Sequence, residues 1–113
     1  IQTILLAANN VGVSFEILVF DDNSTDNTVA VVENLIAKDP EKNIVLKRNP
    51  KTLGLGRNYT DGAFVGKGNY YMLVNGDNVE PVEAIARILK QLGTADMVIP
   101  YFGNCDDRSF FRR

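Results

Sequence analysis

The sequence predicts an α/β fold in which a mostly parallel sheet carries helices on both faces. Short apolar runs alternate with amphipathic stretches, and the connections are short, which favours a doubly wound sheet with right-handed crossovers. The apolar runs are continuous rather than interrupted by polar residues, as expected for strands covered on both sides. Acidic and amide residues directly follow two of these runs, and ligands bind at the carboxyl edge of open parallel sheets.

Four strands and four helices follow from these patterns. The strands are predicted over Glu16–Phe20, Asn43–Lys47, Asn69–Val74 and Asp96–Pro100. The helices are predicted over Ile1–Asn10, Thr28–Lys38, Arg57–Val65 and Pro81–Leu92. The second and fourth helices each have an apolar face, formed by Val29, Val32, Leu35 and Ile36 in one and by Val82, Ile85, Ala86, Leu89 and Leu92 in the other. Pro81 suits a first helical position and Gly93 the residue after a helix end, whereas Gly62 interrupts the third helical pattern.

Length and composition predict a single, partial domain over residues 1–113. The 113 residues fit one domain, and the chain opens in a helix, so we expect the first strand of the sheet to be missing. The net charge of −2 gives no electrostatic case for nucleic acid as a partner. A single cysteine, Cys105, and the absence of histidine predict a reducing, cytoplasmic location and a metal bound through oxygen atoms.

Two carboxylates follow the first predicted strand. Asp21 comes directly after Phe20, so its side chain either faces the crevice above the sheet edge, where it can bind a base or ribose, or is buried at an energetic cost. Asp22, Ser24 and Asp26 lie where the next helix begins, and side-chain oxygens at such positions cap free amides. Ligand contact and turn or cap formation both remain open for this segment.

Two further segments suggest binding chemistry. Asn75-Gly76-Asp77-Asn78 follows a strongly apolar run, and Asp77 can supply the carboxylate that Mg²⁺ or Mn²⁺ takes from protein, although the same string also makes a good turn. Gly54-Leu55-Gly56-Arg57 places a guanidinium beside the free amides of a helix start, which predicts an anion site. A Rossmann fingerprint would need glycine where Tyr59 stands.

In order along the chain, these segments resemble the GT-A glycosyltransferases of family 2, in particular the dolichyl- or polyprenyl-phosphate mannosyltransferase branch. Phe15–Thr28 is similar to the family's apolar strand followed by Asp-Asp-Gly-Ser and x-Asp-x-Thr. Asn49-Pro50 with Gly54–Tyr59 is similar to its Asn-x-x-Gly-Leu-Gly segment, and Gly68-Asn69-Tyr70 to the Gly-x-Tyr before its metal-binding strand. The resemblance covers essentially the whole chain and implies a Rossmann-like GT-A fold.

The resemblance also implies roles for individual residues. Asp21 would contact the nucleotide base and Arg57 would lie near the nucleotide or its phosphates, with Asp22 and Gly54 completing the candidate nucleotide-binding set. Asp77 would bind a Mn²⁺ or Mg²⁺ ion that bridges the sugar diphosphate. Asn75 stands where the family's Asp-x-Asp has its first aspartate, so it offers an oxygen without charge.

The activity implied is transfer of a sugar from a GDP- or UDP-sugar to a polyprenyl phosphate or a glycan, with no catalytic residue identified. A lipid phosphate is already an anion and needs little help from a base, which suits a chain without histidine. The location implied is cytoplasmic, at the cytoplasmic face of a membrane through segments outside this sequence.

Two alternatives remain open. A receiver domain of two-component signalling also has paired aspartates after one strand and a third after another, roles that Asp21, Asp22 and Asp77 would fill, although Ile99-Pro100-Tyr101-Phe102 lacks the expected lysine. The other alternative is an inactive family member that binds nucleotide or a partner. Asn75, which replaces the first aspartate of the family's Asp-x-Asp, favours this alternative.

Overall fold

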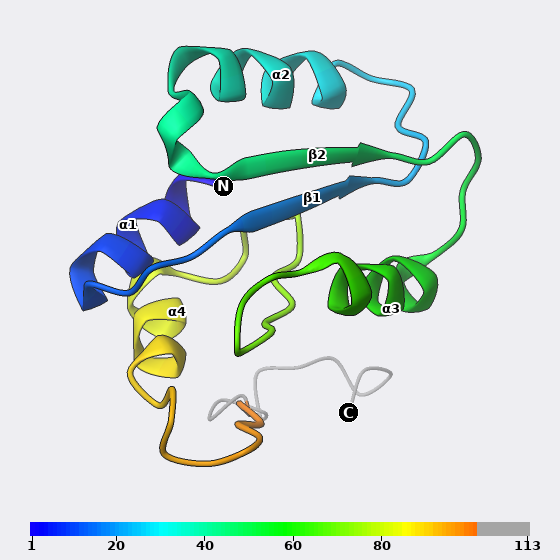
Figure 1. The fold of residues 1–113 in the computed structure, drawn as a ribbon. Helices are drawn as coiled ribbons and strands as arrows, with labels where there is room; N and C mark the ends of the chain where they lie inside the picture. The colour runs from blue at the N-terminus through cyan, green and yellow to red at the C-terminus, as the bar shows by residue number, and fades with distance from the viewer. Residues whose placement is uncertain (102–113) are drawn as a thin grey trace, which may run out of the picture.

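The structure is a computed structural model that describes residues 1–101. It forms an α/β fold around two parallel strands, β1 (Ile17–Asp21) and β2 (Ile44–Arg48), with α2 on one side of the strands and α3 on the other (Figure 1). The helices are α1 (Gln2–Val11), α2 (Thr28–Lys38), α3 (Leu55–Val65), α4 (Val82–Leu89) and the 3₁₀ helix η1 (Pro40–Lys42). The predicted α/β class with helices on both faces is therefore confirmed, while the extent of a single domain over 1–113 stays a prediction.

The two faces of β1 pack against different helices. Side chains alternate along a strand, so Ile17, Val19 and Asp21 share one face, and Leu18 and Phe20 share the other. Ile17 lies in the main apolar cluster, which comprises Leu5, Ile17 and Ile44 with Ile1, Ile4, Phe15, Val19, Leu35 and Ile36 packed against them. The opposite face meets α3, where a methyl group on Gly62 would lie 3.3 Å from the Phe20 ring. Helix α3 is thereby fixed beside the carboxyl end of β1.

The bounds of α1, α2 and both strands agree with the sequence prediction to within one residue. Helix α2 spans the predicted range and buries Val32, as its apolar spacing requires. Helix α1 ends at Val11 and is capped by Gly12, whose φ is 74° and whose backbone amide donates a hydrogen bond to the Ala8 carbonyl. Within residues 1–101, no helix has the length and apolarity needed to cross a membrane.

Helix α4 is shorter than predicted and packs against α1 (Figure 1). It buries Ile85 to 1% exposure and ends at Leu89 rather than Leu92. Beyond Leu89 the amides of Gln91 and Leu92 bond to carbonyls three residues back, so the chain continues as tight turns. The predicted end was wrong because these last side chains are exposed, and no packing extends the helix there.

The predicted strands Asn69–Val74 and Asp96–Pro100 are not present as strands. Both segments are apolar, but many of their side chains are exposed, including 53% of Tyr70 and 76% of Ile99. A strand needs a neighbour that takes up its backbone N–H and C=O groups, and among the described residues neither segment has one. The apolar composition of these two segments predicted that they are buried, but a strand also requires a neighbouring strand to pair with.

Gly62, which interrupts the helical pattern in the sequence, lies at a close contact inside α3. The helix spans the position without a break, and Gly62 is buried. A Cβ atom there would lie 2.3 Å from the Tyr71 hydroxyl oxygen, which in turn donates a hydrogen bond to the Tyr59 carbonyl at 3.0 Å. Glycine at this position allows the segment after α3 to pack onto the helix.

We expect Gly62→Ala to lower the free energy of unfolding by about 1 kcal/mol. Overpacking costs about 1–3 kcal/mol, while alanine gains about 0.5–1 kcal/mol from its higher helix propensity. The measurement is urea denaturation, with Gly56→Ala as the matched control. Gly56 has no atom within 4 Å of an added Cβ, so this variant should be stabilised. In a Tyr71→Phe background the Gly62→Ala penalty should shrink, and an unchanged penalty would contradict the assigned contact.

Candidate functional site

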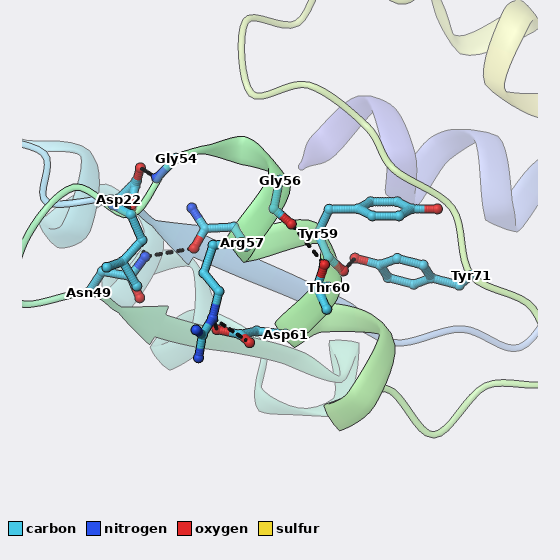
Figure 2. A network of polar contacts seen from close by, with 11 residues as sticks. Asp22, Asn49, Gly54, Gly56, Arg57, Tyr59, Thr60, Asp61 and Tyr71 are labelled. Carbon is cyan, nitrogen blue, oxygen red and sulfur yellow. Dashed lines mark hydrogen bonds and ion pairs between the residues drawn. The ribbon is translucent and has the colours of Figure 1, made fainter.

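The carboxylate of Asp22 joins the end of β1 to the start of α3. It accepts three hydrogen bonds of 2.8 Å each, from the Leu53 amide, the Gly54 amide and the Asn49 side-chain amide. Figure 2 shows Asp22 and Gly54 bonded in front of the first turn of α3, with Asn49 beside them. Two of the predicted ligand residues, Asp22 and Gly54, therefore contact each other across 32 residues of sequence.

Asn49 is the central residue of this junction. Its side-chain amide also donates to the side-chain oxygen of Asn58 at 2.7 Å, and its backbone amide donates to the carbonyl of Asp21 at 2.9 Å. Asn58 is only 9% exposed, so it is a buried polar residue with a partner. The segment after β2 is thus held to β1 and to α3 at once.

The hydrogen-bond donors around Asp22 favour its charged form. They lower the pKa of Asp22 from 3.8 to about 2, the amide of Leu53 having the largest effect and the Asn49 side chain the next. Desolvation acts in the opposite direction but is the weaker influence. Asp22 is therefore ionised at any physiological pH, and its negative charge is directed at the backbone that precedes α3.

Asp21 is buried, with 5% exposure, on the same face of β1 as Ile17 and Val19. Its Oδ1 accepts a long hydrogen bond of 3.4 Å from the Ser24 amide. Of the two positions left open by the sequence, a crevice-facing side chain and a buried one, the structure shows the buried one. Asp26 has a capping contact, because its Oδ1 accepts a 2.9 Å hydrogen bond from the Thr28 amide at the start of α2.

Arg57 lies one turn beyond this junction. Its Nε donates to both carboxylate oxygens of Asp61 at 2.8 Å, and this hydrogen bond and charge raise the pKa of Arg57 (Figure 2). The pair uses Nε, so the two Nη groups are outside it. The first helical hydrogen bond of α3 runs from the Asn58 amide to the Gly54 carbonyl, and the three amides before it have no i−4 partner within the helix.

The turn containing Asp77 contacts α1 and the residue before α4. The Thr3 hydroxyl donates to the Asn78 side-chain oxygen at 2.6 Å, and the Asn75 side-chain amide donates to Glu80 Oε1 at 3.3 Å. Asp77 itself is exposed and accepts a 3.3 Å hydrogen bond from the Val79 amide. Among the hydrogen bonds of residues 1–101, none links this turn to the Asp22 junction.

The chemistry of the turn suits a hard cation. The described part of the chain has no cluster of three or more His, Cys, Asp or Glu side chains. Mg²⁺ needs only one or two carboxylates when a diphosphate and water supply the other ligands, and Asp77 is an exposed carboxylate. Asn75 donates its hydrogen bond to Glu80 through Nδ2, so its Oδ1 is left as a second oxygen that can bind a metal ion.

Asn49, Asn58 and Glu80 were not among the residues predicted from the sequence. Their hydrogen-bond partners are distant in the chain or belong to another turn, so the local spacing of residues gave little indication that these three side chains contribute to the site. One signal was available, because Asn58 lies four residues before Gly62 on the buried side of α3, and a buried asparagine needs a hydrogen-bond partner.

Comparison with known proteins gives a consistent family signal. The sequence profile described as glycosyl transferase family 2 matches residues 2–113. A dolichyl-phosphate beta-glucosyltransferase of Dictyostelium discoideum is 31% identical over 75 residues, 66% of this chain and 23% of that protein. The dolichyl-phosphate beta-glucosyltransferase ALG5C of Trichomonas vaginalis is 29% identical over 86 residues, 76% of this chain and 25% of that protein.

A third relative is the uncharacterized protein MT1568 of Mycobacterium tuberculosis, 36% identical over 67 residues, 59% of this chain and 20% of that protein. The chain thus spans about a quarter or less of the length of these curated relatives. No solved structure matches the chain.

Proposed function

The chain belongs to glycosyl transferase family 2, and from this we propose that the protein transfers a sugar from a nucleoside diphosphate sugar to a polyprenyl phosphate. Two relatives are named dolichyl-phosphate beta-glucosyltransferases, which supports a lipid phosphate as the acceptor. Their names also make glucose a candidate for the transferred sugar, beside the mannose that the family resemblance implied. The donor nucleotide is GDP or UDP in this proposal, and the reaction takes place at the cytoplasmic face of a membrane.

The observation that carries the proposal is the junction held by Asp22. It fixes the start of α3, with three amides that lack i−4 partners, beside the carboxyl end of β1. Such a helix start favours a negatively charged group. The amides of Leu53 and Gly54 are used by Asp22, so a ligand would take the amides of residues 55–57 and the Nη groups of Arg57, whose Nε pairs with Asp61. We propose that the diphosphate of the donor binds at this edge. The predicted contact of Asp21 with the base is not part of this proposal, because the side chain of Asp21 is buried, with 5% exposure.

Asp77 and Asn75 are the proposed residues for Mn²⁺ or Mg²⁺. When bound, the ion would stabilise the negative charge that develops on the departing nucleoside diphosphate. The protein's own residues hold and orient the donor, and an acceptor that is already a phosphate anion requires no strong base. Family membership removes the support for a receiver domain, whereas an inactive relative would bind nucleotide without transferring sugar.

The test is titration calorimetry of the intact protein with UDP-glucose and GDP-mannose, with and without MnCl₂. We expect one of the two donors to bind, and Mn²⁺ to tighten that binding by about tenfold or more. Transfer to a short-chain polyprenyl phosphate, measured with a radiolabelled sugar, separates an active enzyme from an inactive relative. Absence of binding to either donor, with the metal present, would contradict the proposal.

A further inference from the structure

The first turn of α3 is held at both of its ends by the Asp22 junction. At the start of the turn, the Gly54 amide donates to Asp22 Oδ2 at 2.8 Å. At its end, the Asn58 side-chain oxygen accepts a 2.7 Å hydrogen bond from Asn49, and the Asn58 amide donates to the Gly54 carbonyl at 3.2 Å. The Asn49 side-chain amide also donates to Asp22 Oδ1 at 2.8 Å, so these four residues form a closed ring of hydrogen bonds.

Residues 55–57 lie between the two held ends, and they are the residues proposed to bind the diphosphate. Their backbone amides have no i−4 partner within the helix, and Arg57 adds its Nη groups. The helix has no cap from a side chain of its own, because the N-cap residue is Gly54. The position of these amides therefore depends on the contacts that the first turn makes with the segments after β1 and β2.

Asn49 is the residue that closes the ring. Its Nδ2 carries two hydrogen atoms, and the side-chain oxygens of Asp22 and Asn58 accept one each. An ionised aspartate of the same shape has no hydrogen atom to donate, and a serine has only one. Both asparagines also lower the pKa of Asp22, which keeps its carboxylate in the form that accepts these hydrogen bonds. Asn49 thus joins Asp22 to α3 in a way that neither aspartate nor serine can reproduce.

The backbone of Asn49 is fixed independently of its side chain. Its amide donates to the Asp21 carbonyl at 2.9 Å, which extends the parallel pairing of β1 and β2 by one residue. Pro50 follows and favours an extended backbone at Asn49. A substitution of the Asn49 side chain therefore leaves the strand pairing in place and removes only the connection to Asp22 and to the first turn of α3.

We propose that Asn49 is a positioning residue for the nucleotide sugar, which holds the first turn of α3 so that the amides of residues 55–57 and the Arg57 guanidinium stay directed at the diphosphate. The inference rests on the proposed function, which assigns the diphosphate to this edge. Asn49 acts through Asp22 and Asn58 and needs no contact with the diphosphate itself. Loss of its side-chain amide therefore weakens binding of the nucleotide sugar and leaves binding of the acceptor unchanged.

The experiment compares steady-state sugar transfer by the intact wild type and by Asn49→Asp, with the nucleotide sugar and polyprenyl phosphate varied in turn. Asn49→Asp keeps the shape, removes both donated hydrogen atoms and places a like charge beside Asp22. We expect the KM for the nucleotide sugar to rise by about tenfold or more, while the KM for polyprenyl phosphate stays within about twofold. A residue that only stabilises the fold would lower the Tm without this split. An unchanged KM for the nucleotide sugar, or an equal rise of both KM values, would overturn the proposal.

The matched control is Asn34→Asp, the same change of charge at an exposed residue of α2, on the other side of the strands from α3 (Figure 1). Both of its KM values should stay within about twofold of the wild type. A double-mutant cycle tests the route of the effect. Because Asn49 acts through Asp22, Asn49→Ala should weaken binding of the nucleotide sugar less in an Asp22→Ala background than in the wild type. Fully additive effects would show that Asp22 is not on the route.

A second variant covers the case in which Asn49→Asp fails to fold. Asn58→Leu removes the oxygen that Asn49 holds and keeps a helix-forming side chain of similar size. It must raise the KM for the nucleotide sugar, and a wild-type value would refute the positioning role. Hydrogen exchange at the Asn58 amide gives a readout without any ligand, and it should become about tenfold faster or more in Asn49→Ala.

The failure of this inference differs from the failure of the proposed function. If the wild type binds a nucleotide sugar and Asn49→Asp binds it equally well, Asn49 has no positioning role and the proposed function stands. If the wild type binds no nucleotide sugar, both proposals are wrong.

Discussion

Replacing Asp77 by alanine is expected to reduce sugar transfer by the intact protein by about 100-fold or more while leaving the fold unchanged. Asp77 is exposed, and its hydrogen bond is a 3.3 Å contact with the Val79 amide, so little structural stabilisation is lost. What disappears is the carboxylate proposed to hold the divalent ion, and the charge stabilisation that such an ion supplies corresponds to a factor of about this size. The measurement is initial-rate transfer at saturating MnCl₂, with circular dichroism to verify folding.

Asp39→Ala is the matched control for this variant. Asp39 is also part of a surface turn, where it pairs with Lys42 at 2.9 Å, and no role in the reaction is proposed for it. Its removal should change the transfer rate by less than about twofold, as expected for an exposed ion pair. If Asp77→Ala keeps wild-type activity and wild-type dependence on Mn²⁺, the assignment of Asp77 to the metal is wrong.

Replacing Asp22 by alanine is expected to release the start of α3 from the end of β1. The variant loses three hydrogen bonds to a charged acceptor and leaves the amides of Leu53 and Gly54 without their partner. Hydrogen exchange at these two amides should become about tenfold faster or more, and donor binding should weaken by a similar factor. The measurements are exchange followed by NMR and titration with the donor that the wild type binds.

The pH dependence of the same junction gives an independent check. The folded pKa of Asp22 is about 2, below the ordinary value of 3.8, so its contribution to stability is fully present above pH 3.8. That contribution is lost progressively as the pH falls through about 2. Asp22→Asn should abolish this part of the acid dependence, whereas Asp26→Ala should leave exchange at Leu53 and Gly54 unchanged, since Asp26 bonds to Thr28. Unchanged acid dependence in Asp22→Asn would contradict the assigned network.

Local patterns predicted the elements whose packing or pairing partners lie within the described residues. Helix α2 has the predicted bounds because a 3.6-residue apolar period is a property of neighbouring residues, and β1 and β2 are continuous apolar runs that find each other as parallel partners. The predicted strands at 69–74 and 96–100 had the same apolar character but no partner within the described residues. The periodicity of apolar residues indicates which side chains favour burial. It contains no information on which other segment lies beside a strand and pairs with its backbone.

The candidate site was predicted in pieces. The sequence selected Asp22 and Gly54 separately, the first at a strand end and the second before a helix, and the structure joins them by a 2.8 Å hydrogen bond. The sequence offered Asn49 only as part of a motif, whereas in the fold it connects Asp22 with Asn58. Asp21 could face solvent or be buried on sequence grounds, and its position on the face of Ile17 and Val19 decides for burial.

The sequence by itself determined the α/β class, the positions of α1, α2, β1 and β2, the family resemblance and the residues that could bind a charged ligand. Only the tertiary structure decided that the carboxylate of Asp22 is engaged by backbone amides and that Asp21 is buried. The physical reason is the range of the interactions. Helical periodicity acts over a few residues, whereas Asp22 bonds to a residue 32 positions away and Thr3 to one 75 positions away.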